Sequence, residues 1–405
     1  MRAPEGGGPT RMHILIAGGG VAALEAVLAL RALAEDRVSI ELVTPEEYFT
    51  YRPLAVAEPF GVGEVKSFPL RALTEAAGAR FRSGLVAAVD PERHVVASQD
   101  GEELAYDLLL LALGAKPREA VPNALTFRGP EDGPAIAALL DEALAGEVRS
   151  IAFALPAGAS WPLPLYELAL LTGNFLTDRG TRGVAVKLVT PEESPLAIFG
   201  AEARDAIREL LERRGIELRL RTTPLSVDEG GLRVAPDGVV EAERVVALPR
   251  LEGPWIPGIP SDAHGFVPTD EFGRVGSQED VYAAGDVTQF PLKQGGIATQ
   301  QADAAAAAIA ARAGAPVEPV PFKPVLCGLL LTGMTPRYLR AEAGTARSAV
   351  DAEALWWPPA KIVGRYLAPF LATHLGTAQT QPEPSDAVPV EVEFDPNEDG
   401  FWSRI

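Results

Sequence analysis

The chain has 405 residues, of which 47% are hydrophobic and 22% charged, a composition typical of soluble globular proteins. At about 100–200 residues per domain, this length predicts two domains and a smaller appendage. The formal net charge of −19 argues against nucleic acid as a partner and against broad attachment to anionic lipid, because both need a basic surface. The single cysteine, Cys327, excludes an intramolecular disulfide and a redox-active cysteine pair.

The two ends of the chain are expected to lie outside the folded core. Residues 1–11 are rich in Gly and Pro, lack the apolar core of a secretory signal and predict a disordered lead-in. Residues 378–405 carry seven acidic residues and one basic residue and form an acidic tail. No run approaches the roughly 20 apolar residues that span a bilayer, so a cytoplasmic location is expected.

The first folded region has the order strand, glycine turn, helix, strand. His13–Ala17 is a short apolar strand, and the apolar residues between Leu24 and Leu33 follow a helical spacing. Val38–Val43 is a second strand. This βαβ order predicts a parallel sheet.

The same order returns in the middle of the chain. Ile151–Leu155 is a strand, Leu165–Thr172 begins a helix, and Val184–Val189 is a strand. Both second strands run into the same six residues, Leu-Val-Thr-Pro-Glu-Glu, at 42–47 and 188–193. We interpret this as an internal repeat, so the predicted fold class is α/β with two Rossmann-like dinucleotide-binding domains.

The remaining elements complete these domains. Glu103–Leu113 is predicted to be one strand that runs into a glycine turn, and Gln300–Arg312 an Ala-rich helix. Short strands are expected at 244–248 and 280–284. The predicted units are a split first domain (12–118 plus 251–316), a second domain (119–250) and a C-terminal interface segment (317–377).

The turn after the first strand fits the dinucleotide-binding pattern G-x-G-x-x-A. Gly18 permits the tight turn, Gly20 lets the backbone approach a pyrophosphate, and Ala23 lets helix and strand pack closely. The helix N-terminus adds N–H donors and a partial positive charge. We expect Gly18, Gly19, Gly20 and Ala23 to bind a dinucleotide; the alternative is a merely tight turn. Glu46 is the nearest carboxylate for the ribose hydroxyls, or else a solvated turn residue.

Two further strings strengthen this interpretation. Ala105–Gly114 and Asp280–Asp286 are apolar strands that each run into a glycine. Together with Gly18–Ala23, in this order, they resemble the flavoproteins of the pyridine-nucleotide:disulfide-reductase fold, with Leu113 where that family usually has threonine. The resemblance covers about residues 12–316 and implies FAD as the cofactor, bound to the split first domain.

The family pattern also implies where FAD is held. Asp286 would accept hydrogen bonds from the ribityl chain, and the backbone of Val86 would touch the adenine. The helix that follows has no acid before Asp303, so its positive end is free to favour the negative charge of reduced flavin. Further cofactor contacts are implied at Ala112, Gly114, Gly285 and Gly296.

Within that fold the chain resembles sulfide:quinone oxidoreductases, the flavin subunit of flavocytochrome c sulfide dehydrogenase, and type II NADH dehydrogenases. Tyr51–Leu54 resembles the segment that lays a proline, here Pro53, against the flavin ring. Pro162–Glu167 resembles a Pro-rich stretch of the sulfide enzymes. Glu167 falls where relatives carry a glutamate near the flavin and is expected to serve proton transfer, with a pKa raised by burial. The alternative is a first-turn glutamate favoured by the helix dipole.

The chain departs from these relatives at the thiols and at the second nucleotide site. Their sulfide oxidation uses cysteines beside the flavin, whereas Ser160-Trp161 stands at one such place, and Cys327 is more typical of a small buried hydrophobe. Ordinary sulfide:quinone chemistry is therefore not expected.

The loop Pro156–Pro162 replaces the second G-x-G-x-x-G and leaves fewer N–H donors for a pyrophosphate. We therefore expect weak or absent NAD(P)H binding, although Thr190–Glu192 could still bind a ribose.

Residues 355–375 place apolar side chains at helical spacing beside tryptophans and basic residues. Such a stripe is typical of monotopic quinone enzymes that contact the inner face of a membrane. A homodimer or interdomain contact explains it equally well, and Pro369 would break or kink the helix. Gln300 and Gln301 resemble, by position only, the quinone-side glutamines of type II NADH dehydrogenases. No metal site is expected, because none of the four histidines has a partner at metal-ligand spacing.

These observations predict an FAD-dependent oxidoreductase that passes electrons from an unidentified small reductant to a quinone or protein acceptor. One alternative is an FAD-binding interaction or sensor subunit with little turnover, suggested by the degraded second site and the missing thiols. Another is an NAD(P)H dehydrogenase with an atypical phosphate loop.

Overall fold

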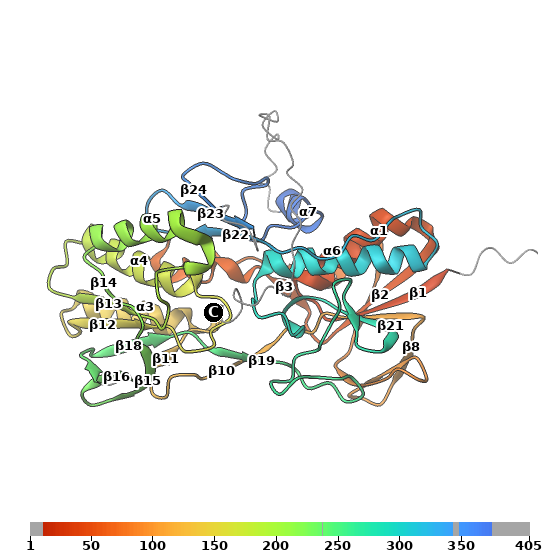
Figure 1. The fold of residues 1–405 in the computed structure, drawn as a ribbon, viewed down its shortest axis with the longest axis horizontal. Helices are drawn as coiled ribbons and strands as arrows, with labels where there is room; N and C mark the ends of the chain where they lie inside the picture. The colour runs from red at the N-terminus through yellow and green to blue at the C-terminus, as the bar shows by residue number, and fades with distance from the viewer. Residues whose placement is uncertain (1–10, 237, 343–347, 375–405) are drawn as a thin grey trace, which may run out of the picture.

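The computed structural model describes residues 11–236, 238–342 and 348–374. They form two α/β halves that lie side by side, and the C-terminal segment runs across both (Figure 1). The first half contains a six-stranded sheet of order β20-β21-β9-β1-β2-β5. Its strands are β1 Met12–Ala17, β2 Val38–Thr44, β5 Arg80–Ser83, β9 Leu108–Leu111, β20 Arg274–Val275 and β21 Gln278–Ala283.

This sheet is covered on both faces, which explains its apolar strands. β1 pairs in parallel with β2 and β9, and all four leucines of β9 are buried. Helices α1 (Val21–Ala34) and α6 (Gly295–Arg312) pack together on one face. A small antiparallel sheet packs on the other face; its strands are β6 Val86–Asp90, β7 Val95–Ser98 and β8 Glu103–Ala105. The half is completed by β3 Tyr48–Thr50, β4 Ser67–Pro69 and α2 Leu70–Ala76.

The second half is built on a parallel sheet of order β11-β18-β12-β13-β14. Its strands are β11 Leu125–Thr126, β12 Ser150–Ala154, β13 Ala185–Val189, β14 Glu217–Arg219 and β18 Arg244–Ala247. The helices are α3 Gly133–Leu144, α4 Leu163–Asp178 and α5 Gly200–Arg213, and a hairpin sheet adds β15 Thr223–Asp228, β16 Gly231–Ala235 and β17 Val239–Val240. Helix α4 is apolar on nearly every side because it lies between this sheet and the C-terminal segment.

The chain passes between the halves at two short strands. β10 (Lys116–Arg118) and β19 (Arg250–Glu252) pair in antiparallel fashion. We propose that the domain boundaries lie here, next to residues 118 and 250. All strands of the five-stranded sheet lie between β10 and β19 in the sequence, and all strands of the six-stranded sheet lie before β10 or after β19.

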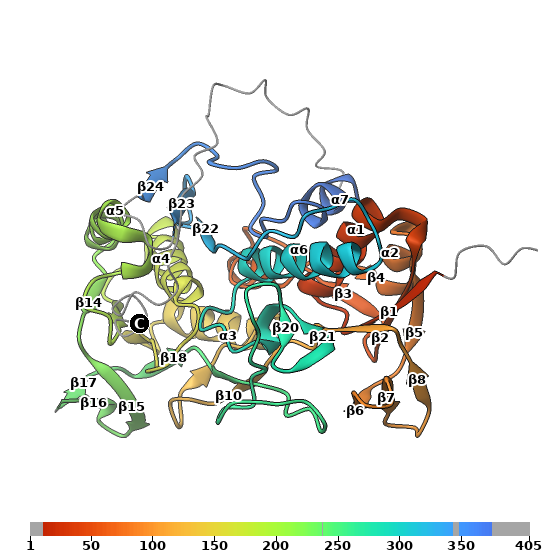
Figure 2. The ribbon, with the colours of Figure 1, turned by 45° about the vertical axis from the view of Figure 1, so that its right-hand side comes forward.

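The C-terminal segment spans both halves (Figure 2). Its sheet, β22 (Val325–Leu330), β23 (Arg337–Glu342) and β24 (Ser348–Asp351), packs on α4 and α5, whereas α7 (Leu367–His374) packs on α1. Ile362, Leu367 and Leu371 are buried in the same core as α1. The apolar stripe predicted at 355–375 is thus largely covered within the chain, which favours the interdomain explanation. None of the helices in the described ranges is long and apolar enough to cross a bilayer.

Three predicted elements differ in the structure. The single strand expected at Glu103–Leu113 is wrong: the backbone N–H of Asp107 donates to the His13 carbonyl at 2.9 Å, and the segment splits into β8 and β9. The helix expected from Gln300 begins at Gly295 instead, because the Gln294 side chain accepts a hydrogen bond from the backbone N–H of Ile297 at 2.9 Å and caps it there.

The third difference concerns the C-terminal helix. Only Leu367–His374 is helical, so Pro369 is the third residue of α7. At this position its missing N–H breaks no helical hydrogen bond. The predicted lead-in, apart from Arg11, and the predicted acidic tail lie outside the described residues.

A buried carboxyl pair fastens α7 to the first half. Glu25 of α1 is fully buried and accepts hydrogen bonds from the backbone N–H groups of Tyr366 and Leu367, at 2.8 and 2.7 Å. Its neighbour Asp303 of α6 interacts with it through a side-chain hydrogen bond. Burial, followed by the charge of Glu25, raises the pKa of Asp303 from 3.8 to about 8, and Arg365 opposes this shift. Glu25 therefore replaces the missing helical acceptors at the N-terminus of α7.

Replacing Asp303 by Asn should stabilise the protein more at pH 9 than at pH 5. The folded chain holds an extra proton between pH 4 and 8, because the pKa of Asp303 is raised on folding. Wild-type stability therefore falls as the pH rises through this range, and Asn imitates the protonated acid. Thermal unfolding followed by circular dichroism at both pH values measures the effect. A gain that is equal at both pH values, or that also occurs in the exposed control Asp36→Asn, would contradict it.

Candidate functional site

The glycine turn predicted to bind a dinucleotide lies where β1 ends. Gly18 adopts φ +124°, its N–H donates to the Val43 carbonyl at 2.8 Å, and a Cβ on it would overlap the Ala112 carbonyl. A Cβ on Gly19 would lie 2.7 Å from Leu70 Cδ1. Beside Gly20, in contrast, a Cβ would meet no atom within 4 Å. The first two glycines are thus required by packing, and the third leaves open space at the N-terminus of α1.

A second helix N-terminus converges on the same place. Gly285 adopts φ +81°, and a Cβ on it would lie 2.9 Å from Ala22 Cβ and 3.5 Å from Ala298 Cβ. It therefore lets the first turns of α1 and α6 approach each other. Neither helix has an acidic residue in its first turn, so both partial positive charges are available to an anion. Gly296 is the second residue of α6.

Asp286 stands beside these helix ends without a partner in the described chain. Its carboxylate makes no hydrogen bond or ion pair to a described residue, although the side chain is only partly exposed. Burial raises the pKa of Asp286, and the nearby charge of Lys293 lowers it. A carboxylate with unused acceptors in a crevice suits a ligand that carries hydroxyl groups, such as a ribityl chain.

The remaining predicted cofactor residues lie at the same edge of the first sheet. Ala112 and Gly114 follow β9, and Ala23 is fully buried in the first turn of α1. Val86 begins β6. Glu46 is exposed after β2, and its carboxylate accepts a hydrogen bond from the Thr44 hydroxyl. The structure brings these residues together along the carboxyl ends of the strands, where ligands bind in such sheets; their individual contacts with FAD stay predictions.

These features fit FAD. The open space at Gly20 and the N-terminus of α1, which has no side-chain cap, suit a pyrophosphate, and the unpaired Asp286 suits the ribityl chain. Residues that would hold FAD are Gly18, Gly19, Gly20, Ala23, Glu46, Val86, Ala112, Gly114, Gly285, Asp286 and Gly296.

A buried ion pair joins the two halves and the C-terminal segment beside Pro53. Lys361 Nζ lies 2.6 and 2.8 Å from the two carboxylate oxygens of Glu167, and it donates to the Pro53 carbonyl at 3.1 Å. The Lys361 and Glu167 side chains are 8% and 1% exposed. Glu167 also accepts a hydrogen bond from the backbone N–H of Leu331 at 2.8 Å. It lies in the second turn of α4 and is ion-paired, so the alternative of a first-turn glutamate is wrong.

Burial raises the pKa of Glu167, and the charge and hydrogen bonds of Lys361 oppose that shift. Burial favours the protonated form of Glu167, and Lys361 favours its carboxylate. The pair lies beside Pro53, in the segment predicted to touch the flavin ring. A buried carboxyl group whose pKa is raised can hold a proton. Sequence reasoning found Glu167 but missed Lys361 as its partner, because nearly two hundred positions separate them.

Gln300, Gln301 and Cys327 have structural roles in the described chain. The Gln300 side chain exchanges two hydrogen bonds with the backbone of Val325, at 2.9 and 2.8 Å. The Gln301 side chain accepts from the backbone N–H of Gly285 at 2.8 Å. Neither amide is free in the manner expected of a quinone contact. Cys327 is buried, and burial raises the pKa of its thiol to about 11, so it is not a reactive thiolate at neutral pH.

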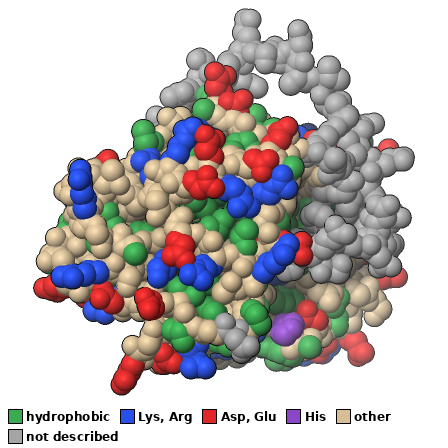
Figure 3. All heavy atoms as spheres, turned by 60° about the vertical axis from the view of Figure 1, so that its left-hand side comes forward, with side chains coloured by type: hydrophobic (Ala, Val, Ile, Leu, Met, Phe, Trp, Pro, Cys, Tyr) green, Lys and Arg blue, Asp and Glu red, His purple; other side chains and the backbone are tan. Residues whose placement is uncertain are grey.

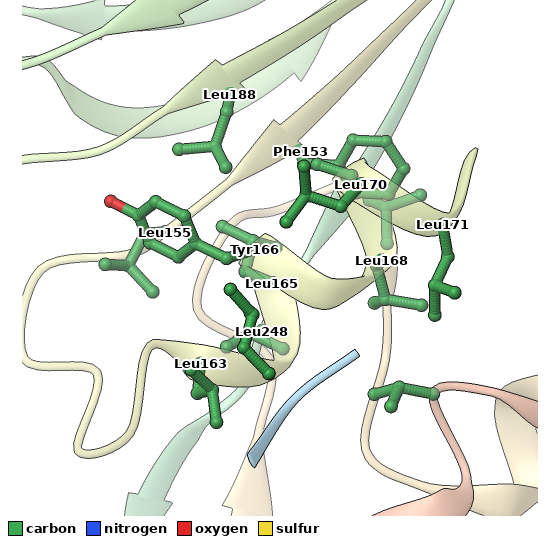
Figure 4. Close-up of a cluster of buried hydrophobic side chains, with 14 of the residues drawn as sticks. Phe153, Leu155, Leu163, Leu165, Tyr166, Leu168, Leu170, Leu171, Leu188 and Leu248 are labelled. Carbon is green, nitrogen blue, oxygen red and sulfur yellow. The ribbon is translucent and has the colours of Figure 1, made fainter. Parts of the chain in front are cut away.

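The acid at the expected second dinucleotide site is held by neighbouring hydroxyl groups. Glu192 follows β13, where a ribose-binding acid would stand, but it accepts hydrogen bonds from the Tyr166 hydroxyl at 2.6 Å and the Thr190 hydroxyl at 2.8 Å. Tyr166 lies among the apolar side chains at the start of α4 (Figure 4). Burial raises the pKa of Glu192. The acid position is kept; its Oε2 is engaged by both hydroxyls, whereas its Oε1 is buried without a hydrogen-bond partner among the described residues.

Comparison with known proteins agrees with this geometry. The family model for pyridine nucleotide-disulphide oxidoreductases matches residues 12–141 and 174–310. The chain therefore belongs to this family. It is an FAD-dependent oxidoreductase, as its relatives are, and the expected α/β fold with two Rossmann-like domains is confirmed.

Two relatives show how far the likeness extends. Sulfide-quinone reductase of Aquifex aeolicus is 24% identical over 301 residues, or 69% of each chain. Human apoptosis-inducing factor 3 is 27% identical over 322 residues, which is 71% of this chain and 47% of that protein. This chain thus spans about half the length of the second relative.

Solved structures show the same fold. The sulfide:quinone oxidoreductase of Aquifex aeolicus superposes with a TM-score of 0.76 at 19% identity, covering 84% of this chain and 86% of that one. A ferredoxin reductase from Rhodopseudomonas palustris gives a TM-score of 0.63 at 18% identity, covering 82% and 83%.

Replacing Gly20 by Asp should abolish FAD binding without unfolding the protein. Gly20 is the N-cap of α1 with φ −90°, its Cβ position is open, and Asp is a favourable N-cap. The new carboxylate would repel a pyrophosphate at this helix end. The neutral isostere Gly20→Asn should weaken FAD binding less. FAD content after gel filtration, together with circular dichroism, measures both effects, and a Gly20→Asp protein that retains FAD would refute this placement.

Proposed function

We propose that the protein passes electrons from a small reductant other than NAD(P)H to a quinone or protein acceptor. FAD, when bound, supplies the exchange of an electron pair between two substrates that react in turn. The observation that carries the proposal is that Tyr166 and Thr190 both donate hydrogen bonds to Glu192 Oε2, so the expected ribose-binding acid of the second domain has one oxygen engaged within the chain.

Two further features of the second domain disfavour a pyridine nucleotide. The loop 156–162 contains two prolines, which lack the N–H groups that a pyrophosphate needs. The N-terminus of α4 is also covered: Leu163 is buried, and a Cβ on Gly328 of β22 would lie 2.7 Å from Phe199 Cζ and 3.4 Å from Leu163 Cδ2. The C-terminal sheet therefore occupies space beside the helix end where phosphate would bind.

The same loop forms a wall toward the first half. The backbone N–H of Lys293 donates to the Ser160 carbonyl at 3.3 Å, so the loop lies against the start of α6. A small reductant needs no phosphate-binding site and can reach the cofactor beside the loop 156–162. We place the donor side here.

The ion pair of Glu167 and Lys361 supplies the proton chemistry. Reduction of a quinone takes up two protons, and a protein acceptor such as a ferredoxin takes up none. A proton held at Glu167 Oε or Lys361 Nζ can be delivered to an acceptor near Pro53 and replaced from solvent through the partly exposed segment 353–366. This pair therefore favours a quinone over a protein as the acceptor.

The relatives motivate both acceptor classes. One is named a sulfide-quinone reductase, and a solved structure of similar fold is a covalent putidaredoxin reductase–putidaredoxin complex. On the face of the molecule that Figure 3 shows, basic and acidic side chains are interspersed among the described residues. That face therefore has no broad field of one sign to steer a highly charged protein acceptor.

Anaerobic rapid mixing tests the donor half. The FAD-loaded protein is mixed separately with NADH, NADPH and sulfide, and the oxidised-flavin absorbance is followed. We expect neither nicotinamide to bleach the flavin within the first seconds, whereas chemically reduced protein should be reoxidised by a soluble quinone. Fast bleaching by NADH would refute the proposal and establish a nicotinamide dehydrogenase. Reduced protein that no quinone or ferredoxin reoxidises would instead indicate a sensor subunit.

Replacing Lys361 by Met should slow reoxidation by a quinone. General acid–base groups contribute about 10²–10⁴-fold, so a loss of about 10²-fold is expected in the quinone step. Loss of the ammonium also leaves the Glu167 carboxylate buried and unpaired, which costs about 3–5 kcal/mol of stability. The double variant Glu167→Gln/Lys361→Met removes that carboxylate and serves as the stability control. Unchanged quinone kinetics in both folded variants would exclude the pair from proton transfer.

A further inference from the structure

Lys293 is a buried cation that the roles described above do not use. It immediately precedes Gln294, the N-cap of α6, and its side chain is 7% exposed. Its ammonium donates to the Thr288 carbonyl and lies 3.9 Å from the centre of the Phe266 ring. No carboxylate of the described residues lies within ion-pair distance of it, in contrast to the buried Lys361.

A buried ammonium without an ion-pair partner is costly. One carbonyl and one aromatic face satisfy only part of it, because a lysine has three N–H donors. Burial lowers the pKa of Lys293 to about 8, while the charges of Asp286 and then Asp262 oppose that shift. The residue therefore still carries its charge at neutral pH, inside the protein, where Coulomb interactions act over longer distances than in water.

The charge of Lys293 lies close to the expected FAD site. Asp286, which is expected to hold the ribityl chain, feels Lys293 electrostatically. The backbone of Lys293 also lies at the loop between the two halves, through its hydrogen bond to Ser160 at 3.3 Å. The next residues form the N-terminus of α6, which has no acidic residue in its first turn. The ammonium and the helix end thus contribute positive charge on the same side of the site.

We propose that Lys293, together with the N-terminus of α6, raises the reduction potential of the bound FAD. Reduction adds negative charge to the flavin, so a nearby fixed cation stabilises the reduced form more than the oxidised form. This inference rests on FAD lying against Gly285 and Asp286, and it does not depend on which donor or acceptor the protein uses.

Potentiometric titration of the FAD-loaded protein tests this role. Lys293→Met and Lys293→Gln should shift the midpoint potential to more negative values. A tenfold change in the ratio of the dissociation constants for oxidised and reduced FAD corresponds to about 30 mV for a two-electron couple, and we expect at least this shift. Lys293→Arg, which keeps the charge, should remain near the wild-type value, as should Lys66→Met, which removes an exposed lysine.

Two neutral variants, Lys293→Met and Lys293→Gln, are used so that the test does not depend on one variant loading FAD. If Lys293→Met does not load FAD, the comparison of Lys293→Gln with Lys293→Arg decides, because Gln can still donate to the Thr288 carbonyl. A folded, FAD-loaded neutral variant with the wild-type potential would overturn the inference, and so would Arg and Gln variants that shift equally. Reduction by NADH would refute the proposed donor class without changing any of these potentials.

Discussion

The arrangement of the three parts of this protein depends on the buried ion pair between Glu167 and Lys361. Glu167 comes from the central helix of the second half, Lys361 from the C-terminal segment, and the lysine also binds the Pro53 carbonyl of the first half. Two charges taken out of water are stable only when each is fully paired and hydrogen-bonded. The pair therefore constrains all three parts to one relative position, and it does so beside the expected flavin segment.

Other buried ionisable groups follow the same rule at the ends of helices and strands. Glu25 accepts from the first N–H groups of α7, and Glu192 accepts from Tyr166 and Thr190. Both oxygens of Glu25 and Oε2 of Glu192 are engaged within the chain, whereas Glu192 Oε1 is buried without a partner among the described residues. Asp286 and Lys293 differ, because neither has an ion-pair partner among the described residues. Asp286 and Lys293 lie beside the N-termini of α1 and α6, neither of which has an acidic residue in its first turn, and these two groups beside positive helix ends distinguish the first dinucleotide site.

Local sequence patterns predicted the parts of the fold that local chemistry decides. The glycine turn at Gly18–Gly20 follows from strand and helix periodicity and from the packing limits on each glycine, and the repeated Leu-Val-Thr-Pro-Glu-Glu string revealed the second βαβ unit. The same string could not show that Glu192 accepts a hydrogen bond from Tyr166, because Tyr166 lies on another element. One signal was available for Glu25: a charged residue on the apolar face of α1 implies a buried acceptor role.

The central claim is that this chain folds around one FAD at the junction of α1, α6 and β21. The most direct measurement is the amount of FAD per chain, from the absorbance spectrum of the purified protein and of the cofactor released by denaturation. The account predicts one FAD per chain, retained through gel filtration. A folded, monodisperse protein that contains no FAD and takes up none from an excess in solution would contradict it.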